Sequence, residues 1–168
     1  DLRAEALESA KNSIAKILSD GVRLGKVSEE QSRQALERLT TSADLVKPLA
    51  NPQVGLLIET VTESMSAKTA IAREADQALP ERAVIATNTS ALSVTEIAAS
   101  TKRPDRVIGM HFFNPVHKMK LVEIVRGAQT SEAALARARA FTGAIERLPL
   151  DVKSSPGFLV NRILMPYL

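Results

Sequence analysis

The sequence predicts an α/β domain with a largely parallel sheet, and two observations carry that prediction. Short runs that are apolar on both faces alternate with segments of helical periodicity, the pattern of a parallel sheet covered by helices on both sides. The chain has 168 residues, of which 45% are hydrophobic and 24% charged, as in one ordinary globular domain. No internal repeat or low-complexity segment interrupts the alternation.

The first predicted elements are two helices. Apolar residues recur at helical spacing over residues 2–19, so we expect a helix that ends at Asp20-Gly21. Ser28 and Gln31 have the spacing of a capping box and predict a second helix that runs to about residue 39. The short connector between them predicts a helical hairpin.

The first strands follow this hairpin. Residues 40–43 predict a short strand, and the stretch VGLLI over residues 54–58 predicts a clearer one that is apolar on both faces. Ser64 then has the position of a helix cap, Pro80 ends that helix, and residues 83–86 predict the next strand. Together these segments predict a strand–helix–strand unit.

The alternation continues to the end of the chain. Ser93 and Glu96 have capping-box spacing and predict a short helix before Pro104. The remaining expected elements are strands over residues 106–112, 121–125 and 150–152, a helix over residues 132–146, and an apolar helix introduced by Pro156-Gly157. The order of elements supports the α/β class.

Several classes of protein are excluded by composition. The chain has no cysteine, which removes disulfide scaffolds, thiolate metal sites, iron–sulfur clusters and cysteine nucleophiles. No apolar run approaches the length of a membrane span, and the N-terminus lacks the pattern of a signal peptide. We therefore expect a soluble, cytoplasmic protein.

The charge is modestly basic, with a net charge of +3 and a pI near 9.4. The excess lies in residues 101–150, where the aromatic residues Phe112 and Phe113 are adjacent rather than spaced for stacking on bases. No groove-reading motif accompanies them. We expect no nucleic-acid partner, and the basic excess suits a small anionic ligand equally well.

Polar side chains follow three of the expected strands, at the point where each strand ends. In parallel sheets, ligands bind beyond the carboxyl ends of the strands. The residues concerned are Glu59, Thr60, Thr62 and Glu63 after the first strand, Thr87, Asn88, Thr89 and Ser90 after the second, and His111 and Asn114 after the third. Hydroxyls, amides, carboxylates and an imidazole at one edge predict a binding site.

His111 and Glu123 are the strongest candidates for chemistry. An imidazole exchanges protons near neutral pH, and Glu123 is a carboxylate within the apolar strand LVEIV, where burial requires a partner. A hairpin-like return of that strand would bring Glu123 to His111, where it fixes the imidazole tautomer and stabilises the imidazolium. The alternatives are a strand-end histidine bonded to the backbone and an edge-strand glutamate that faces water.

Other candidates receive weaker assignments from the residues alone. Ser90 lacks the Gly-x-Ser-x-Gly context of a nucleophile, so we expect it to hydrogen-bond, and Asn161 has the ordinary roles of capping or helix–helix bonding. Glu59, Glu63, His111 and Glu123 include no closely spaced pair of metal ligands, so we expect no metal. No Gly-x-Gly occurs, so a phosphate-cradling loop lies outside this sequence.

Three segments together resemble the L-3-hydroxyacyl-CoA dehydrogenase family of fatty-acid oxidation. The segments are IATNTSALSVTEIA, GMHFFNPVHKMKLVEIVRG and SSPGFLVNRILMPYL, and the resemblance extends from Asp1 to Leu168. HFFNPVHKM is more similar to the dehydrogenase part of the multifunctional fatty-acid oxidation proteins than to the stand-alone enzyme. The family implies an NAD-dependent oxidation of L-3-hydroxyacyl-CoA to 3-ketoacyl-CoA.

The resemblance implies roles for residues at matching positions. His111 matches the catalytic base, Glu123 its carboxylate partner, Ser90 the serine that hydrogen-bonds the substrate oxygen, and Asn161 the amide that completes this polar set. Asp1 matches the acidic residue that binds the adenosine ribose, which favours NAD over NADP. The residues matching contacts to the nicotinamide and its ribose are Glu63, Lys68, Asn88, Ser90 and Asn114.

The family pattern is incomplete in this sequence. Its first strand, GxGxxG turn and helix would precede Asp1, and its all-helical C-terminal domain, which closes over acyl-CoA and forms a homodimer, would extend beyond Leu168. We therefore expect an incomplete Rossmann-like, doubly wound domain over residues 1–154 and the first helix of the C-terminal domain over residues 155–168. The 168 residues alone are expected to bind NAD poorly, to turn over little and to associate through the exposed sheet edge.

Two other functions compete with this one. A catalytically silent relative would serve as a structural or binding protein, but it has no chemical reason to retain Ser90, His111, Glu123 and Asn161. A dehydrogenase of hydroxy acids without CoA is compatible with the fold, since fold does not determine function. The segments HFFNP and PGFLVNR favour the CoA family.

Overall fold

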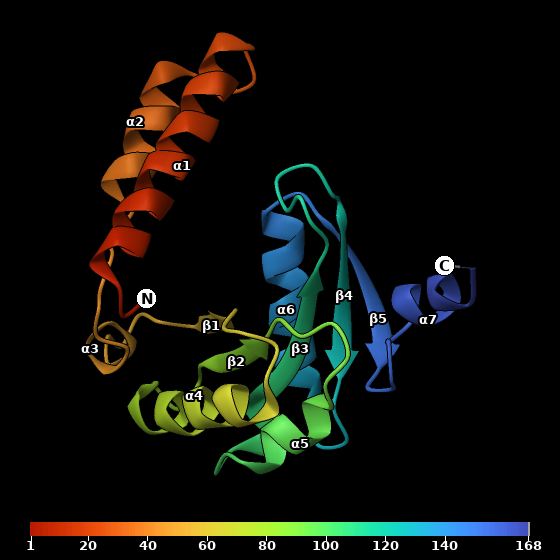
Figure 1. The fold of residues 1–168 in the computed structure, drawn as a ribbon. Coiled ribbons are helices and arrows are strands. Elements are labelled where there is room, and N and C mark those ends of the chain that lie inside the picture. Colours follow the sequence, from red (N-terminus) through yellow and green to blue (C-terminus); the bar gives the residue numbers. More distant parts are fainter. Residues whose placement is uncertain (168) are drawn as a thin grey trace. The chain divides into compact units, whose positions relative to one another are not determined.

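The structure is a computed structural model that describes residues 1–167 and consists of two compact units, residues 1–48 and a second unit that begins at Leu49 (Figure 1). The boundary expected between residues 154 and 155 stays a prediction. Of the helices described, none combines the length and the apolar composition needed to cross a membrane.

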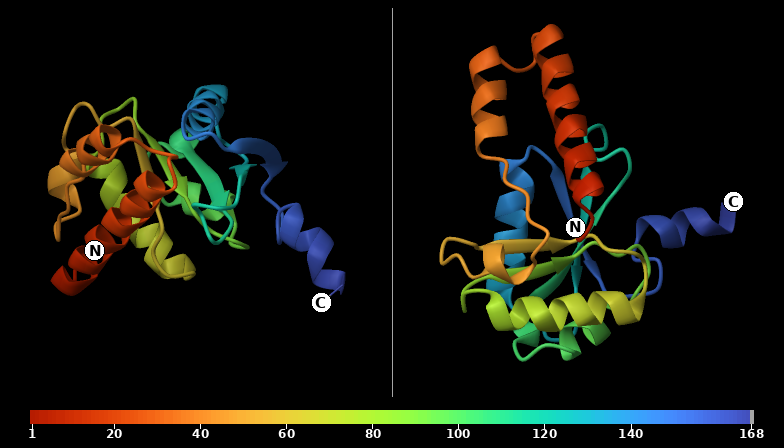
Figure 2. Two further views of the ribbon diagram at one scale, coloured as in Figure 1. Left: turned by 90° about the horizontal axis from the view of Figure 1, so that it is seen from above. Right: turned by 60° about the vertical axis from the view of Figure 1, so that its left-hand side comes forward.

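The first unit is the expected helical hairpin. Helices α1 (Ala4–Arg23) and α2 (Glu29–Glu37) lie side by side in all three views (Figures 1 and 2). The capping box is confirmed: the Gln31 N–H donates to Ser28 Oγ at 3.1 Å, and the Ser28 N–H donates to Gln31 Oε1 at 2.9 Å. Local sequence therefore determines where α2 begins.

The predicted end of the first helix at Asp20-Gly21 is wrong. Gly21 is helical, and α1 ends one turn later, where Gly25 has a φ of +66°. The Lys26 N–H donates to the Gly21 carbonyl and the Gly25 N–H to the Val22 carbonyl, which is the Schellman arrangement. The helix therefore ends at a glycine, as predicted, but at Gly25 rather than Gly21, because Gly25 adopts the left-handed conformation that the end of the helix requires.

The predicted strand over residues 40–43 is also wrong, because this segment has no strand partner within the described chain. The Ser42 hydroxyl instead bonds both the N–H and the carbonyl of Asp44. Asp44 Oδ1 accepts the Lys47 N–H at the start of the short helix α3 (Val46–Leu49). Local side-chain hydrogen bonds have replaced strand pairing.

The second unit contains a five-stranded sheet in sequence order. The strands are β1 (Leu56–Glu59), β2 (Val84–Thr87), β3 (Val107–Phe112), β4 (Leu121–Arg126) and β5 (Leu148–Lys153). Strands β1, β2 and β3 are parallel, β4 is antiparallel to β3, and β5 is parallel to β4. The predicted α/β fold with a mostly parallel sheet is confirmed, and β4 is the expected returning strand.

Helices cover both faces of this sheet. Helices α4 (Met65–Ala78) and α5 (Val94–Ala99) lie on one face and α6 (Glu132–Ala144) on the other (Figures 1 and 2). A 3-10 turn over Pro104–Arg106 precedes β3. The chain continues after β5 into α7 (Val160–Leu164) and a 3-10 turn over Met165–Tyr167.

Of the two serine caps predicted for the helices of this unit, Ser93 is confirmed and Ser64 is not. Ser93 Oγ accepts the Glu96 N–H at 3.2 Å and opens α5. Ser64 precedes α4, but its side chain accepts no capping hydrogen bond from that helix and lies 2.9 Å from Ser66 Oγ. Pro80 follows α4 as expected, because proline cannot continue a helix.

Successive side chains of β3 point to opposite faces of the sheet. Ile108 and Met110 are fully buried and pack with Leu135 of α6. Gly109 points to the other face, where a methyl group would lie 2.9 Å from Val94 of α5. His111 is two residues after Gly109, so its side chain points to the same face, which α5 covers, at the carboxyl end of β3.

Candidate active site

The antiparallel pairing of β3 and β4 places His111 directly opposite Glu123. His111 Nδ1 and Glu123 Oε2 are 2.7 Å apart, and the Glu123 side chain is fully buried. The edge-strand alternative for Glu123 and the backbone-bonded alternative for His111 are therefore wrong. An ionised carboxylate can only accept, so it receives Nδ1–H and leaves the lone pair on Nε2.

The second oxygen of Glu123 receives two backbone donors. The Leu159 and Val160 N–H groups, at the start of α7, donate to Glu123 Oε1 at 3.0 and 2.9 Å. One buried carboxylate thus binds the imidazole and the chain segment that follows β5. Three donors satisfy the charge that burial would otherwise make costly.

A tight turn brings this segment to Glu123. Gly157 has a φ of +71°, and a methyl group there would lie 3.2 Å from the Arg162 nitrogen. Phe158 follows with a φ of +50° and is buried. Its ring lies edge-on to His111 with the centroids 5.8 Å apart, and Phe113 packs on the same imidazole at 4.5 Å. Aromatic rings therefore limit how the imidazole can turn.

The sequence analysis missed the part played by Phe158 and by the two N–H groups of Leu159 and Val160. Pro156-Gly157 was the available signal, since this pair marks a turn, but it does not show what the turn reaches. The contact with Glu123 joins residues 36 and 37 positions apart. Such a contact depends on the packing of the whole sheet.

Asn88 joins the end of β2 to the end of β3. Its Oδ1 accepts the Phe112 N–H at 3.0 Å, and its own N–H donates to the Glu59 carbonyl at 2.8 Å. The first contact fixes the orientation of the amide, because Oδ1 is held by a backbone donor. Asn88 Nδ2 makes no hydrogen bond within the described residues and remains able to donate to a ligand.

Glu63 holds the loop that carries Ser90. Glu63 Oε1 accepts from Thr89 Oγ1 and from the N–H groups of Ser90 and Ala91. Partial burial acts to raise the pKa of the Glu63 carboxyl, but these hydrogen bonds and the nearby Lys68 charge outweigh it and lower that pKa. Glu63 is therefore an anion that organises the loop.

Ser90 and Asn161 meet through the Ser90 backbone. Asn161 Nδ2 of α7 donates to the Ser90 carbonyl at 3.3 Å. Ser90 is exposed, and its hydroxyl makes no hydrogen bond in the part of the chain that the structure describes. The two candidates are brought together, and the serine hydroxyl is left able to bond a ligand.

Lys68 lies beneath this edge, fully buried in α4. Its ammonium donates to Glu59 Oε1 at 3.0 Å, to the Asn88 carbonyl at 3.1 Å and to the Val61 carbonyl at 3.3 Å. Glu63 Oε2 is 3.6 Å away. From the sequence, Glu59 is a polar residue at a strand end and a metal-ligand candidate without a closely spaced partner, whereas the structure shows it buried at the centre of a polar cluster.

Two of the predicted cofactor residues are not part of this cluster. Asn114 is exposed in the loop between β3 and β4. Asp1 belongs to the first unit, where its carboxylate accepts the Arg3 N–H at 2.9 Å. Their contacts with a cofactor stay predictions.

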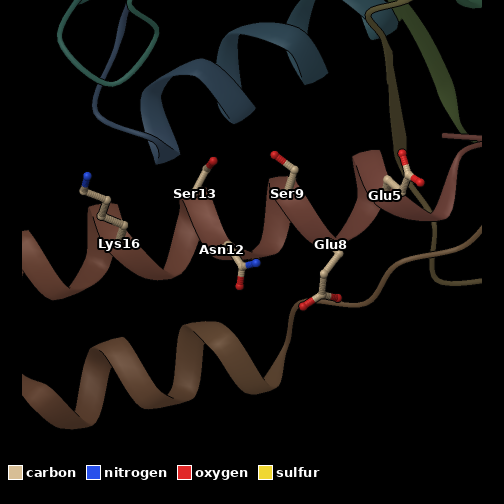
Figure 3. Close-up of a pocket in the computed structure, with 6 residues that line it drawn as sticks. All are labelled: Glu5, Glu8, Ser9, Asn12, Ser13 and Lys16. Atoms are coloured by element: carbon tan, nitrogen blue, oxygen red, sulfur yellow. The ribbon is translucent and has the colours of Figure 1, made fainter.

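Two hollows on the surface are lined by residues other than His111 and Glu123. One runs along α1 and is lined by polar and charged side chains that project in several directions from this helix (Figure 3). The other lies at the amino ends of β2 and β3, beside Arg82 and Arg106, opposite the candidate site. The candidate active site is therefore assigned to the polar residues around His111 and Glu123 and not to either hollow.

Comparison with known proteins identifies the family of this chain. The family described as 3-hydroxyacyl-CoA dehydrogenase, NAD binding domain, matches residues 1–155. The fatty acid oxidation complex subunit alpha of Idiomarina loihiensis is 39% identical over 100% of this chain. The chain spans 23% of the length of that relative.

Solved structures of two bacterial enzymes have the same fold. The (S)-3-hydroxybutyryl-CoA dehydrogenase of Ralstonia eutropha is 39% identical with a TM-score of 0.93, and this chain covers 58% of it. The 3-hydroxybutyryl-CoA dehydrogenase of Escherichia coli is 37% identical, with the same TM-score and 35% coverage of that chain. Both matches cover 99% of the present chain.

The family match over nearly the whole chain confirms the resemblance inferred from HFFNP and PGFLVNR, and with it NAD as the cofactor of the family. The catalytic role of His111 and the contacts of individual residues with NAD are not tested by these similarities. The chain belongs to the NAD-binding domain family of the 3-hydroxyacyl-CoA dehydrogenases.

Proposed function

We propose that the complete polypeptide, meaning the natural chain that contains these 168 residues, oxidises L-3-hydroxyacyl-CoA to 3-ketoacyl-CoA in fatty-acid oxidation. The observation that carries the proposal is the buried pair of His111 and Glu123, 2.7 Å apart at the carboxyl end of β3. A histidine base at the polar, carboxyl-end edge of the sheet is suited to removing the proton of a substrate hydroxyl.

His111 acts as the general base in this proposal. Nε2 takes the hydroxyl proton of the substrate, while Nδ1–H stays bonded to Glu123 and the carboxylate stabilises the imidazolium. Bound NAD⁺ supplies the acceptor for the hydride that leaves C3. In the reverse direction, His111 returns the proton to the carbonyl oxygen.

Ser90 and Asn161 position the substrate. The Ser90 hydroxyl has no partner within the described residues and would bond the reacting oxygen, and Asn161 holds the Ser90 backbone from α7. Such positioning, together with proton transfer, typically contributes about 100- to 10,000-fold in rate.

The polar edge fits the nicotinamide half of the cofactor. Asn88 Nδ2 offers two N–H donors, and Glu63 Oε2 offers an anionic acceptor to ribose hydroxyls. Asn114 and Ser90 would add contacts from the neighbouring loops, with Lys68 beneath them and Asp1 on the adenosine ribose.

The class of substrate is tested by comparing a CoA ester with the free acid. The complete polypeptide is assayed with NADH and either acetoacetyl-CoA or acetoacetate. The proposal requires rapid NADH oxidation with the ester and little with the acid. Equal rates would favour a hydroxy-acid dehydrogenase without CoA, and no oxidation with either would favour a silent relative.

We further propose that the complete polypeptide acts on acyl-CoA as a homodimer in the cytoplasm. The names of the Ralstonia and Escherichia enzymes support an acyl-CoA substrate, and the dimer follows from the family resemblance. Sedimentation equilibrium tests the dimer, since a monomer at the assay concentration would contradict it. Cell fractionation tests the compartment.

A further inference from the structure

The buried ion pair of Glu59 and Lys68 has no part in the proton transfer proposed above. Glu59 ends β1 and Lys68 lies in the first turns of α4, yet both side chains are almost completely inaccessible to solvent. Burying two charges is costly unless their hydrogen bonds are satisfied, and such a pair contributes little net stability compared with apolar residues. We therefore expect the ion pair to act by positioning the groups that it contacts.

All three N–H donors of the Lys68 ammonium are used within the protein. They are directed to Glu59 at 3.0 Å and to the carbonyls of Val61 and Asn88 at 3.3 and 3.1 Å. An ammonium group has three donors and no acceptor. Lys68 therefore cannot donate to a ligand without giving up one of these contacts.

Glu59 uses its carboxylate in the same way. Besides Lys68, it accepts from Thr87 Oγ1 at 2.6 Å and from the Val61 N–H at 2.6 Å. Val61 belongs to the loop after β1, and Thr87 is the last residue of β2. One carboxylate thus joins the ends of two strands to α4.

Asn88 connects the contacts of Glu59 and Lys68 to β3, the strand that carries His111. Lys68 holds the Asn88 carbonyl, and Asn88 Oδ1 holds the Phe112 N–H, one residue after His111. We propose that Glu59 is a positioning residue, which acts through Lys68 on Asn88 and so sets the cofactor-binding edge relative to His111. This inference rests on the proposed function, although its structural part is tested separately.

Replacing Glu59 by glutamine breaks this chain of contacts in a defined way. The Glu59→Gln side chain keeps one acceptor oxygen but cannot neutralise the buried ammonium. The Lys68 ammonium is then expected to move toward Glu63, whose Oε2 lies 3.6 Å away, and toward water, which releases the Asn88 carbonyl. We expect Asn88 to become mobile and the Phe112 N–H to open to solvent more often.

Hydrogen exchange at the Phe112 amide measures this directly. In the isotope-labelled 168-residue chain, we expect exchange at Phe112 to accelerate by at least about 10-fold in Glu59→Gln, beyond any change in global exchange. Exchange at Phe112 that follows the global rate alone would overturn the positioning role.

Asp76→Asn is the matched control. Asp76 is another buried carboxylate, in α4, and its oxygens accept from Arg103 Nε and the Lys102 N–H of the loop after α5, each at 2.8 Å, away from the cofactor edge. This variant is expected to lose stability without selective exchange at Phe112. Equal acceleration in both variants would overturn the proposal.

Thr87→Val provides a second variant if Glu59→Gln does not fold. It removes one donor to Glu59 while it keeps the shape of the side chain and the ion pair. We expect a smaller but still selective acceleration at Phe112. Unchanged exchange there would contradict the proposed coupling.

Kinetics of the complete polypeptide test the functional consequence. In Glu59→Gln, we expect the KM for NAD to rise and kcat to fall, together by about 100-fold in kcat/KM for NAD, because a displacement near 1 Å can have this cost. The KM for the acyl-CoA substrate should change little, and Asp76→Asn should retain all three constants. Unchanged NAD kinetics would overturn the role of Glu59, whereas an inactive wild type would instead overturn the proposed function.

Discussion

The imidazole of His111 and the carboxylate of Glu123 lie 2.7 Å apart, and the same carboxylate receives the first N–H groups of α7. The proton-transfer pair is therefore also the point where the segment after β5 joins the sheet. A change at Glu123 should affect catalysis and stability together. A change in the turn before α7 should reach His111 through Glu123 and Phe158.

Glu123→Gln should reduce both stability and activity. Glutamine keeps one acceptor oxygen, so it cannot serve the imidazole and both N–H groups as the carboxylate does. We expect a loss of about 1–3 kcal/mol in the free energy of unfolding, measured by urea denaturation. Glu132→Gln, at a glutamate that is paired with Arg126 on the surface, should change it by less than about 0.5 kcal/mol. Equal effects would contradict the buried role of Glu123.

Gly157→Ala should destabilise the turn before α7. An alanine at a φ of +71° is strained, and its methyl group would lie 3.2 Å from the Arg162 nitrogen. We expect a loss of about 1–2 kcal/mol in the free energy of unfolding. The control is Gly143→Ala, in α6, where a methyl group meets open space and alanine favours the helix by about 1 kcal/mol. If the two variants behave alike, the turn does not need its glycine.

The lowered pKa of Glu63 predicts a dependence of stability on pH. Since the folded pKa lies below the ordinary value of 4.5, the ionised form stabilises the folded chain above that value, and this contribution is lost as the pH falls through the folded pKa. The stability difference between wild type and Glu63→Gln should therefore shrink from about pH 6 to about pH 3. A difference that is constant or grows toward acid would show that Glu63 does not act as an anion.

The pairing of His111 with Glu123 could be predicted because both carry strong local signals. A carboxylate in the apolar run LVEIV must have a partner, and the spacing of 12 residues permits a return to His111. The same kind of signal identified the sheet, since the runs around Leu56, Val84 and Ile108 are apolar on both faces. In these places local sequence and tertiary structure agree.

The errors have equally local causes. The sequence predicts a strand over residues 40–43, but Ser42 bonds Asp44, and a short polar run has little to gain from pairing. The sequence predicts a helix end at Asp20-Gly21, but Gly25 is the glycine that adopts the left-handed conformation. The polar cluster around Lys68 could not be predicted, because its contacts join residues that are far apart in the sequence.

The central claim is that His111 is the base in an NAD-dependent oxidation of 3-hydroxyacyl-CoA. The most direct measurement is the rate of NADH oxidation with acetoacetyl-CoA, for the complete polypeptide and for its His111→Gln variant. We predict rapid turnover by the wild type and a kcat lower by about 100- to 10,000-fold in the variant, with the fold retained. A variant with wild-type kcat, or a wild type that does not oxidise NADH, would contradict the account.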